Sequence, residues 1–478
     1  MLINWLEYHA RQQPDATALV SSQRSWTWGD YRHAVALFAE ELRGAGVRRL
    51  ALALDNGPVW AIADLACLQA GVVCIPVPLF FSPEQCAWLR ASSGAEAQLG
   101  GDVLAGWQTT ETSLGSLQVQ RQSALPELHA GTVKITYTSG TTGMPKGVCL
   151  TRKGINWTAT TLAEVMKPFA VTRHMVTLPL STLLENICGC YVPLVLGVTS
   201  VMPCAAEVGF SGSSQFNSQI FTESLLRWHP QSLVLVPELL RVLLFVQRSE
   251  PAAVDPLKFV ATGGGKISSA LLQAAAQSGL PVFEGYGLSE CGSVVTLNLP
   301  QRQKVGSAGY PLPGVSLSFS AAGDLQVVSP GNAAGYLGEP AFTAPFSTGD
   351  LAEQDSSGFI HIRGRQRNVQ INAFGRNFSP EWIEAEAMGC TAIRRMVIFG
   401  EGLKHNVALV DAYDGMEQSA QAQLAALAAR LPDYARPHHL LFTPFISSPQ
   451  ALTANGRPRR EVIWKKMQQQ ILTFEEES

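Results

Sequence analysis

The sequence predicts an α/β protein: a large N-terminal domain of mixed α/β subdomains with parallel-rich sheets, followed by a small α+β C-terminal domain. The first observation is that helical apolar patterns alternate with short apolar runs through the first two-thirds of the chain. The second is that these runs are apolar throughout, which is typical of strands buried on both faces of a parallel sheet. The third is a change to polar, glycine-rich sequence near residues 350–367.

The individual segments follow this alternation. WAIADLACLQAG (60–71) has a helical pattern ending at a glycine, and VVCIPV (72–77) follows as a strand. SLVLVP (232–237) and LKFVATGG (257–264) are further short strands, each stopped by Pro or Gly. YVPLVLGVTSVMP (191–203) is the most apolar stretch, yet it is too short to span a bilayer. We interpret it as a buried strand and turn and expect no membrane span.

The chain after residue 367 carries elements of its own. MVIFG and NVALV have the pattern of strands, and EQSAQAQLAALAARL has the composition of a helix. We therefore place a domain boundary at Arg367, which gives domains of residues 1–367 and 368–478. No internal repeat or low-complexity tract interrupts either part.

Composition excludes several classes of protein. Hydrophobic residues make up 46% of the 478 residues and charged residues 15%, which is ordinary for a globular enzyme and excludes a disordered chain. The net charge of −3 argues against a nucleic-acid partner. Nine cysteines without a CxxC pair fit reduced thiols in the cytoplasm better than a disulfide framework or a zinc site. The N-terminal residues do not have the pattern of a signal peptide.

The segment YTSGTTGMPKGV (137–148) is the strongest local signal of function. It lies between GTVKIT, which has the pattern of a strand, and GINWTATTLAEVM, which has the pattern of a helix. Glycines in such a loop let backbone N–H groups approach an anion, and hydroxyls and Lys146 add donors and charge. The loop is not a Walker A motif, because Pro145 precedes the lysine and Gly147 follows it.

With this string and the motifs that follow it, the sequence resembles the adenylate-forming superfamily. That superfamily comprises acyl- and aryl-CoA synthetases, adenylation domains of nonribosomal peptide synthetases, and luciferases. The resemblance covers nearly the whole chain, and Asp350 and Arg365 are fifteen residues apart, like the ribose-binding pair of that family. The further matching motifs, in the order of the family, are ATGGGKIS (261–268), FEGYGLSE (283–290), STGD (347–350), GRQRN (364–368) and LTANGRPRR (452–460).

The resemblance implies a two-step reaction with ATP and Mg²⁺. A carboxylate, already ionised at neutral pH, attacks the α-phosphorus of ATP and gives acyl-AMP and pyrophosphate. A thiol, of CoA or of the pantetheine on an acyl or peptidyl carrier protein, then displaces AMP. The first step needs charge neutralisation and alignment rather than a general base. The positions that match the catalytic residues are Thr138, Lys146, Glu290 and Arg457, and those expected to hold magnesium are Glu290 and Thr142.

The same resemblance implies a nucleotide site built from all the matched motifs. Tyr286 would stack on adenine, Asp350 would accept from the ribose hydroxyls and Arg365 would help to fix the ribose. Ser289, with Thr138 and Thr142, would donate to phosphate oxygens. The residues expected to bind ATP or AMP are Ser139, Gly140, Thr141, Thr142, Gly143, Gly263, Gly264, Gly265, Glu284, Gly285, Tyr286, Gly287, Ser289, Asp350, Arg365 and Arg376.

Three of these residues also have a purely structural explanation. Glu290 could be an acid favoured at the start of a helix. Tyr286 could pack in the core, and Asp350 could cap a turn. Each alternative is reasonable for an isolated residue, and the ordered set of motifs favours the functional explanation.

Two positions depart from the family pattern. Arg367 stands at the hinge about which the C-terminal domain of the family swings, where most relatives have Asp or Lys. Arg457 stands where the family has a lysine that bridges the carboxylate and the α-phosphate. Arginine keeps the charge, but the exchange is not conservative, and Lys465 and Lys466 lie too far along the chain to substitute. The alternatives are that Arg457 performs the role of the lysine, or that the protein acts only in the thiol step or is not catalytic.

The acid is expected to be apolar. Among residues 178–186 the only acidic residue is Glu185, which disfavours an amino acid substrate. The pair Arg376-Asn377 resembles that of fatty acyl-CoA synthetases and acyl-AMP ligases, and LLENICGCYVPLVLG and LVLVPELLRVLLFV supply apolar surface for a chain. These segments are equally explained as ordinary core. A fatty acid is the first choice and an aryl acid the second, and the acceptor, CoA or a carrier protein, stays open.

Overall fold

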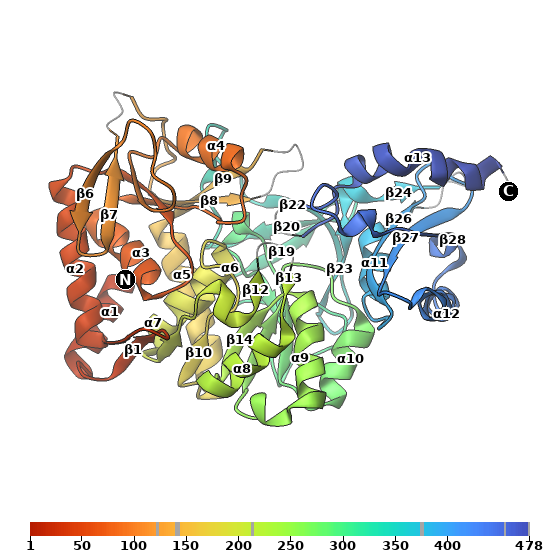
Figure 1. Cartoon of the computed structure of the whole chain (residues 1–478), viewed down its shortest axis with the longest axis horizontal. Coiled ribbons are helices and arrows are strands. Elements are labelled where there is room, and N and C mark those ends of the chain that lie inside the picture. Colours follow the sequence, from red (N-terminus) through yellow and green to blue (C-terminus); the bar gives the residue numbers. More distant parts are fainter. Residues whose placement is uncertain (121–123, 139–143, 212–214, 373–376, 454–455, 477–478) are drawn as a thin grey trace.

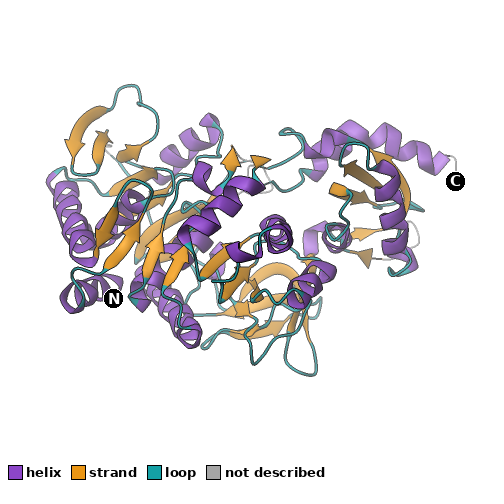
Figure 2. Cartoon of the chain, turned by 60° about the horizontal axis from the view of Figure 1, so that its bottom comes forward, coloured by secondary structure: helices purple, strands orange, loops and turns teal. Residues whose placement is uncertain are grey.

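The computed structural model describes residues 1–120, 124–138, 144–211, 215–372, 377–453 and 456–476. It confirms the α/β class: two large sheets with helices on their faces make up the body of the molecule, and a smaller α+β unit lies to one side (Figure 1). Figure 2 shows the same arrangement, with the smaller unit joined to the body through a narrow region.

The first large sheet contains nine strands within the described ranges, in the order β18-β17-β16-β15-β14-β10-β11-β1-β2. Its centre is parallel, with β10, β11, β14, β15 and β16 all running the same way. The strands are β1 (Thr17–Val20), β2 (Ser25–Thr27), β10 (Arg173–Met175), β11 (Thr199–Val201), β14 (Ser232–Leu235), β15 (Phe259–Thr262), β16 (Val282–Tyr286), β17 (Thr296–Leu297) and β18 (Tyr310–Pro311). The predicted strands at 232–237 and 257–264 are therefore confirmed as β14 and β15.

The second large sheet contains eight strands within the described ranges, in the order β21-β9-β8-β4-β3-β5-β7-β6. The strands are β3 (Arg49–Ala53), β4 (Val73–Pro76), β5 (Ala97–Gly100), β6 (Gln108–Thr112), β7 (Gly115–Val119), β8 (Thr132–Thr138), β9 (Lys146–Thr151) and β21 (Gly335–Tyr336). β3 is buried along its whole length, including Arg49 at its start. A four-stranded sheet of β19 (Ser316–Phe319), β20 (Asp324–Val328), β22 (Phe346–Gln354) and β23 (Ile360–Arg365) completes the body.

Several helices of the body begin or end at a residue whose side chain or backbone conformation favours a helix end. Thr27 and Ser82 form capping boxes at the starts of α2 and α4, and Gly71 ends α3 in the left-handed conformation. The predicted helix at 60–71 is thus confirmed as α3. The principal helices are α1 (Leu2–Gln12), α2 (Trp28–Gly44), α3 (Pro58–Ala70), α4 (Pro83–Ser93), α5 (Arg152–Met166), α8 (Ser218–Trp228), α9 (Pro237–Ser249) and α10 (Ser269–Gln277).

The structure corrects two local predictions. The loop at 137–148 does not join a strand to a helix: it joins the antiparallel strands β8 and β9, and α5 begins only after Thr151, whose side chain caps it. The stretch 191–203 begins as helix rather than strand. Residues Leu183–Glu185 (α6), the π-helical segment Asn186–Tyr191 (η2) and Val192–Leu196 (α7) are continuous, and only Thr199–Val201 pair as strand β11. Apolar runs of this length do not distinguish a buried helix from a strand.

A buried ion pair fixes the π-helical segment to the second sheet. Lys134 on β8 lies 2.8 Å from a carboxylate oxygen of Asp64 on α3, and both side chains are fully buried. Tyr191 accepts from Lys134 at 2.8 Å and donates to Asp64 at 2.6 Å, and Asn186 also contacts both. Each charge therefore has an oppositely charged partner, and both side chains make further hydrogen bonds.

The residues after 367 form a unit with its own sheet. β26 (Ile393–Phe399), β27 (Asn406–Ala412) and β28 (Pro437–Phe442) pair in that order, and α11 (Pro380–Ala387), α12 (Glu417–Ala428) and α13 (Arg460–Glu476) surround them. The short strands β24 (Gln370–Ile371) and β25 (Asn377–Phe378) precede them. The predicted strands and helix of this region are confirmed. The boundary at Arg367, which lies in the short helix η6 (Gln366–Asn368), stays a prediction.

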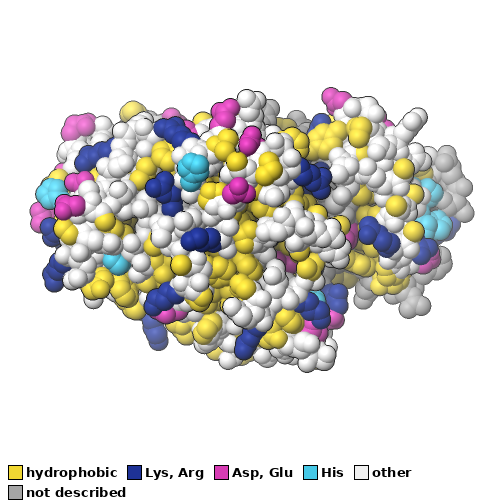
Figure 3. Space-filling model, turned by 90° about the horizontal axis from the view of Figure 1, so that it is seen from below, with side chains coloured by type: hydrophobic (Ala, Val, Ile, Leu, Met, Phe, Trp, Pro, Cys, Tyr) yellow, Lys and Arg dark blue, Asp and Glu magenta, His cyan; other side chains and the backbone are white. Residues whose placement is uncertain are grey.

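Two surface features bear on partners. No helix in the described part of the chain combines the length and the apolar character needed to cross a bilayer. Figure 3 shows Lys or Arg and Asp or Glu side chains interspersed over the face seen from below, with apolar side chains between them. No single sign of charge dominates that face.

Candidate active site

A cavity of about 1110 Å³ lies where the carboxyl ends of β14, β15 and β16 meet the second sheet and the C-terminal unit. Ligand sites of α/β proteins are expected at this edge of a parallel sheet. The predicted residues that line the cavity are Thr138, Lys146, Gly263, Gly264, Gly285, Tyr286, Gly287, Ser289, Glu290, Arg365 and Arg457. Ser139, Gly140, Thr141, Thr142, Gly143 and Arg376 lie outside the described residues.

Asp350, Arg365 and Tyr286 form one hydrogen-bonded group at the edge of the cavity. Asp350 on β22 and Arg365 on β23 are direct partners in the antiparallel register, and Arg365 Nε lies 2.6 Å from Asp350 Oδ1. The Tyr286 hydroxyl donates to Asp350 Oδ2 at 2.7 Å. Burial, followed by the charge of Asp350, raises the pKa of Tyr286 well above its usual value. The phenol therefore stays neutral and holds the buried carboxylate in one orientation.

Glu290 stands in the short helix η5 (Ser289–Cys291) at the cavity wall. The Tyr336 hydroxyl donates to Glu290 Oε1 at 2.7 Å, and the Ala333 N–H donates to the Glu290 carbonyl at 2.8 Å. Burial and the Glu290 charge raise the pKa of Tyr336. A single fixed carboxylate beside a phosphate site fits Mg²⁺, which keeps several waters and takes its other ligands from phosphate oxygens. Among the described residues no cluster of three His, Cys, Asp or Glu side chains that could hold a metal ion occurs.

Lys146, the first residue of β9, places its ammonium at the entrance to the cavity. Its Nζ lies 2.8 Å from Glu339 Oε1 and 4.8 Å from the centre of the Tyr336 ring. Both members of the ion pair are about half exposed, so it contributes little to stability and can exchange for a phosphate partner.

Arg457 reaches the cavity from the C-terminal unit. Its Nη2 donates to the Gly264 carbonyl at 2.7 Å, so that it contacts the glycine-rich segment after β15 directly. Its loop is held by Arg395, whose Nη1 donates to the Gly456 carbonyl at 2.9 Å, and by the Thr453 hydroxyl, which accepts from the Arg457 N–H. Lys465 and Lys466 lie on α13 and do not line the cavity. The structure thus places Arg457, and neither of these lysines, at the cavity.

The glycines of the FEGYGLSE segment have a steric role. A Cβ at Gly287 would lie 1.7 Å from the Ser293 carbonyl oxygen, and one at Gly285 would lie 3.0 Å from the Thr296 oxygen. Only glycine therefore lets the backbone fold back between Tyr286 and Glu290. Glu284 does not line the large cavity: it lines a second cavity of about 240 Å³, and burial raises its pKa to about 7. Gly265 follows the lining residues without being one of them.

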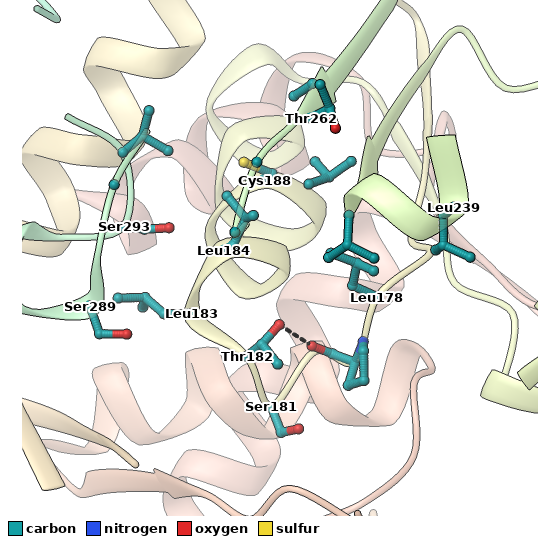
Figure 4. A pocket seen from close by; sticks show the side chains of 18 of the residues that line it. Leu178, Ser181, Thr182, Leu183, Leu184, Cys188, Leu239, Thr262, Ser289 and Ser293 are labelled. Carbon is teal, nitrogen blue, oxygen red and sulfur yellow. Dashed lines mark hydrogen bonds between the residues drawn. The ribbon is translucent and has the colours of Figure 1, made fainter. Parts of the chain in front are cut away.

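Away from the nucleotide residues the cavity becomes apolar. Figure 4 shows Ser289 and Ser293 on one side of the pocket and Leu178 and Leu239 on the other. Glu185, the acid noted in the sequence, does not point into this space, because it is fully buried and accepts from the Leu178 N–H at 3.0 Å. The apolar lining continues along the sheet and includes Leu162, Met166, Val171, Val192, Leu196 and Phe259.

Sequence reasoning missed three residues that shape the site. Tyr336 supports Glu290, Arg395 supports the Arg457 loop, and His174 lines the apolar part of the cavity. Tyr336 and Arg395 lie far in sequence from the residues that they contact, and His174 stands outside the recognised motifs. No pattern within a single segment identifies such residues.

Comparisons with known proteins show the family and the fold of the chain. The sequence profile of the AMP-binding enzyme family matches residues 6–339. A feruloyl-CoA synthase of Amycolatopsis is 27% identical, and the alignment covers 92% of this chain and 94% of the relative. A 2-succinylbenzoate–CoA ligase of Geobacillus kaustophilus is 26% identical, with 92% of this chain and 93% of the relative covered. The o-succinylbenzoate CoA synthetase of Bacillus subtilis, solved with its acyl-adenylate intermediate, superposes with a TM-score of 0.78 at 22% identity, over 96% of this chain and 97% of that one. This likeness shows the fold. The chain belongs to the AMP-binding enzyme family.

Proposed function

We propose that this enzyme joins an apolar carboxylic acid to a thiol in two steps, through an acyl-adenylate. The observation that carries the proposal is that Glu290, Lys146, Arg457 and Arg365, the partner of Asp350, all line one cavity. They come from three different parts of the fold, and the cavity continues into an apolar section. A nucleotide with its phosphates fits the polar part, and an acid fits the apolar part.

Each residue then has a role that follows from its position. Asp350, held by Tyr286 and Arg365, accepts hydrogen bonds from the ribose. Lys146 from the body and Arg457 from the C-terminal unit neutralise phosphate charge, which aligns two anions that would otherwise repel each other. Glu290, fixed by Tyr336, would hold Mg²⁺, which supplies the largest local positive charge when bound. No general base is required because the carboxylate is ionised at neutral pH.

The acid class is proposed from the lining and from the relatives. Two relatives named above act on feruloyl and 2-succinylbenzoate groups, and an indoleacetate–CoA ligase of Aromatoleum aromaticum is 24% identical over 97% of this chain and 97% of its own length. These names favour an aryl acid. The fatty acid, which was the first choice from the sequence, thus becomes the second candidate. It is supported by the apolar section, which extends to Met166 and Leu196, and by a long-chain-fatty-acid–CoA ligase of Mycobacterium bovis that is 26% identical over 86% of this chain and 82% of its own.

The acceptor is proposed to be CoA. The relatives that favour the aryl acid are all named as CoA synthases or ligases. Transfer to the pantetheine of a carrier protein is the alternative, since both thiols have the same reactive end.

Acid-dependent exchange of pyrophosphate into ATP tests the first step without a thiol. We expect exchange with aryl or fatty acids and none with amino acids. Addition of CoA, or of a carrier protein, then identifies the acceptor by thioester formation. Absence of exchange with every acid, while ATP still binds, would contradict the proposal and favour a protein that acts only in the thiol step or is not catalytic.

A further inference from the structure

In the apolar section of the cavity, His174 and Ser232 form a polar pair that the proposed reaction does not use. His174 on β10 and Ser232 on β14 are direct partners in the parallel register, and both side chains line the cavity. His174 Nδ1 lies 2.9 Å from Ser232 Oγ, and His174 Nε2 lies 3.4 Å from Glu185 Oε1. All three side chains are buried. Leu162, Met166, Val171, Val192, Leu196 and Phe259 give this section its apolar lining, and Thr182, Thr262 and Ser293 are further hydroxyl-bearing residues that line the cavity.

The backbone is shaped around this trio. Glu185 stands at the end of α6, where the chain enters the π-helical segment, and π-helical turns are frequent at functional sites. A Cβ at Gly189 would lie 2.9 Å from Glu185 Oε1, so that the glycine makes room for the carboxylate. Glu185 Oε2 accepts from the Leu178 N–H at 3.0 Å. A buried polar group is costly unless it is paired, and here every polar atom except those of Ser232 has its partner inside the trio or on the backbone.

Ser232 has hydrogen-bonding capacity left toward the cavity. A hydroxyl offers one donor and two acceptor sites, and His174 occupies one of them. When the imidazole Nδ1 accepts, the Ser232 oxygen can accept from a ligand. When the imidazole Nδ1–H donates, the Ser232 O–H can donate to a ligand. A ligand hydroxyl fits both arrangements, whereas an ether or carbonyl fits only the second. A second carboxylate would meet no cationic lining residue in this section.

The position of the trio fixes which end of the acid would carry this hydroxyl. Ser232 opens β14, and Leu235, three residues later, ends it beside the nucleotide residues at the carboxyl edge. Three residues of strand span about 10 Å. A group bound at Ser232 therefore lies deep in the section, well away from a carboxylate that reacts at the nucleotide.

We propose that Ser232, oriented by His174 and Glu185, recognises a hydroxyl group at the end of the acid remote from its carboxylate. This inference rests on the proposed function and narrows its substrate to hydroxylated aryl or fatty acids. Ser232 is a specificity-determining residue, and His174 and Glu185 are positioning residues, because they act through it.

Matched pairs of acids test the inference: para-hydroxycinnamic against cinnamic acid, and omega-hydroxydecanoic against decanoic acid. The readout is kcat/KM of pyrophosphate exchange for each member of a pair. We expect the wild-type enzyme to prefer the hydroxylated member of at least one pair by about tenfold or more. Ser232→Ala should reduce that preference to about threefold or less while exchange with the unhydroxylated acid is kept.

Ser200 offers a matched control. It is buried at the same register on β11, partners His174 on the other side, and donates to the Gly189 carbonyl at 2.6 Å without lining the cavity. Ser200→Ala should keep the wild-type preference. The ratio within a pair is unaffected by partial loss of folded enzyme, so a general structural defect does not mimic the result.

Three outcomes are distinguishable. Equal exchange with both members of both pairs overturns the inference and leaves the proposed function intact. A preference that survives in Ser232→Ala overturns the role of Ser232. No exchange with any acid overturns the proposed function, and the inference with it.

Discussion

We expect the adenylation step to depend strongly on the guanidinium group of Arg457. It is the side chain that the C-terminal unit places against the Gly264 carbonyl, at the position of the lysine in the family that the sequence resembles. A planar guanidinium can bind phosphate through two nitrogens, so that the charge is kept although the shape differs.

Replacement of Arg457 by alanine should lower the rate of pyrophosphate exchange by about 100-fold or more, since it removes a charged donor from the developing transition state. Arg457→Lys should keep the rate within about tenfold of wild type. Arg459→Ala is the control: Arg459 is exposed two residues further along and does not line the cavity. Exchange at the wild-type rate in Arg457→Ala would show that this residue has no part in adenylation.

Glu284 predicts a pH dependence of stability. Burial raises its pKa from 4.5 to about 7 in the folded protein, while the nearby Lys266 charge lowers it in part. Between pH 4.5 and 7 the unfolded chain releases this proton and the folded chain retains it. The contribution of Glu284 to the free energy of unfolding is therefore fully present below about pH 4.5 and is lost as the pH rises to about 7.

The side chain introduced by Glu284→Gln cannot ionise, so this variant does not lose stability in this way as the pH rises. The free energy of unfolding of the variant, relative to wild type, should rise by about 3 kcal/mol between pH 4.5 and 7 and then stay constant. Urea unfolding at a series of pH values measures it, with the exposed Glu417→Gln as control. A difference between Glu284→Gln and wild type that does not change with pH would contradict the assigned pKa.

At the scale of the element, the sequence predicts strands and helices well where local signals are strong. α3 is found because Gly71 ends it, and β14 and β15 because Pro or Gly closes each apolar run. The prediction fails where the outcome depends on distant contacts. β9 pairs with β8 and β21, and that pairing makes residues 146–151 a strand before α5 can begin. The helix at 183–196 is fixed by Lys134, which lies about fifty residues earlier.

The residues of the candidate site also divide into those that the sequence predicts and those that only the tertiary fold brings together. Asp350 and Arg365 are fifteen residues apart because they face each other across two adjacent antiparallel strands, so that the spacing in sequence encodes the contact. Tyr336, Arg395 and the His174–Ser232 pair meet their partners only through the tertiary fold. No periodicity or short motif carries that information.

The turn between β16 and η5 depends on glycine. Gly287→Ala would force a methyl group against the Ser293 carbonyl, and the backbone that presents Tyr286 and Glu290 would have to shift. We expect the free energy of unfolding to fall by about 1–3 kcal/mol and the KM for ATP to rise about tenfold. At Gly44, the last residue of α2, a Cβ meets no atom within 4 Å, so Gly44→Ala should be neutral or slightly stabilising. Equal effects of the two substitutions would refute the steric argument.

At the scale of the whole molecule, the body and the C-terminal unit have separate hydrophobic cores. Among the described residues, the buried apolar clusters of the body end at Ile360, and those of the C-terminal unit begin at Phe378. The hydrogen bonds that join the two include those of Arg457 to the Gly264 carbonyl, Arg241 to the Ile393 carbonyl, and Ser269 to Glu386. An interface of this kind favours relative motion of the two parts, and Arg367 lies between them.

A reversible lock tests whether this motion is needed for the thiol step. A Cβ at position 389 would lie 3.2 Å from the Cβ of Ala270 and 2.9 Å from Ser268 Oγ. A small outward shift of residue 389 would bring the first distance to about 3.5–4.5 Å, as in a disulfide, and relieve the second contact. The double variant Ala270→Cys with Gly389→Cys should therefore crosslink α10 to the C-terminal unit in the arrangement that places Arg457 at the cavity. We expect the oxidised variant to keep pyrophosphate exchange but to form thioester at least about tenfold more slowly, if the second step uses a different arrangement of this unit, as the resemblance to the adenylate-forming superfamily implies.

Reduction with dithiothreitol should restore thioester formation in the double variant, because it releases the lock without changing the sequence. The two single variants, treated with the same oxidant, control for reaction at the nine native cysteines, and neither should slow the thiol step. If the oxidised double variant forms thioester as fast as the reduced one, both steps take place in the arrangement seen here. Arg367 would then be a connection between two fixed parts rather than a hinge, and Arg457 would remain at the phosphates throughout the reaction.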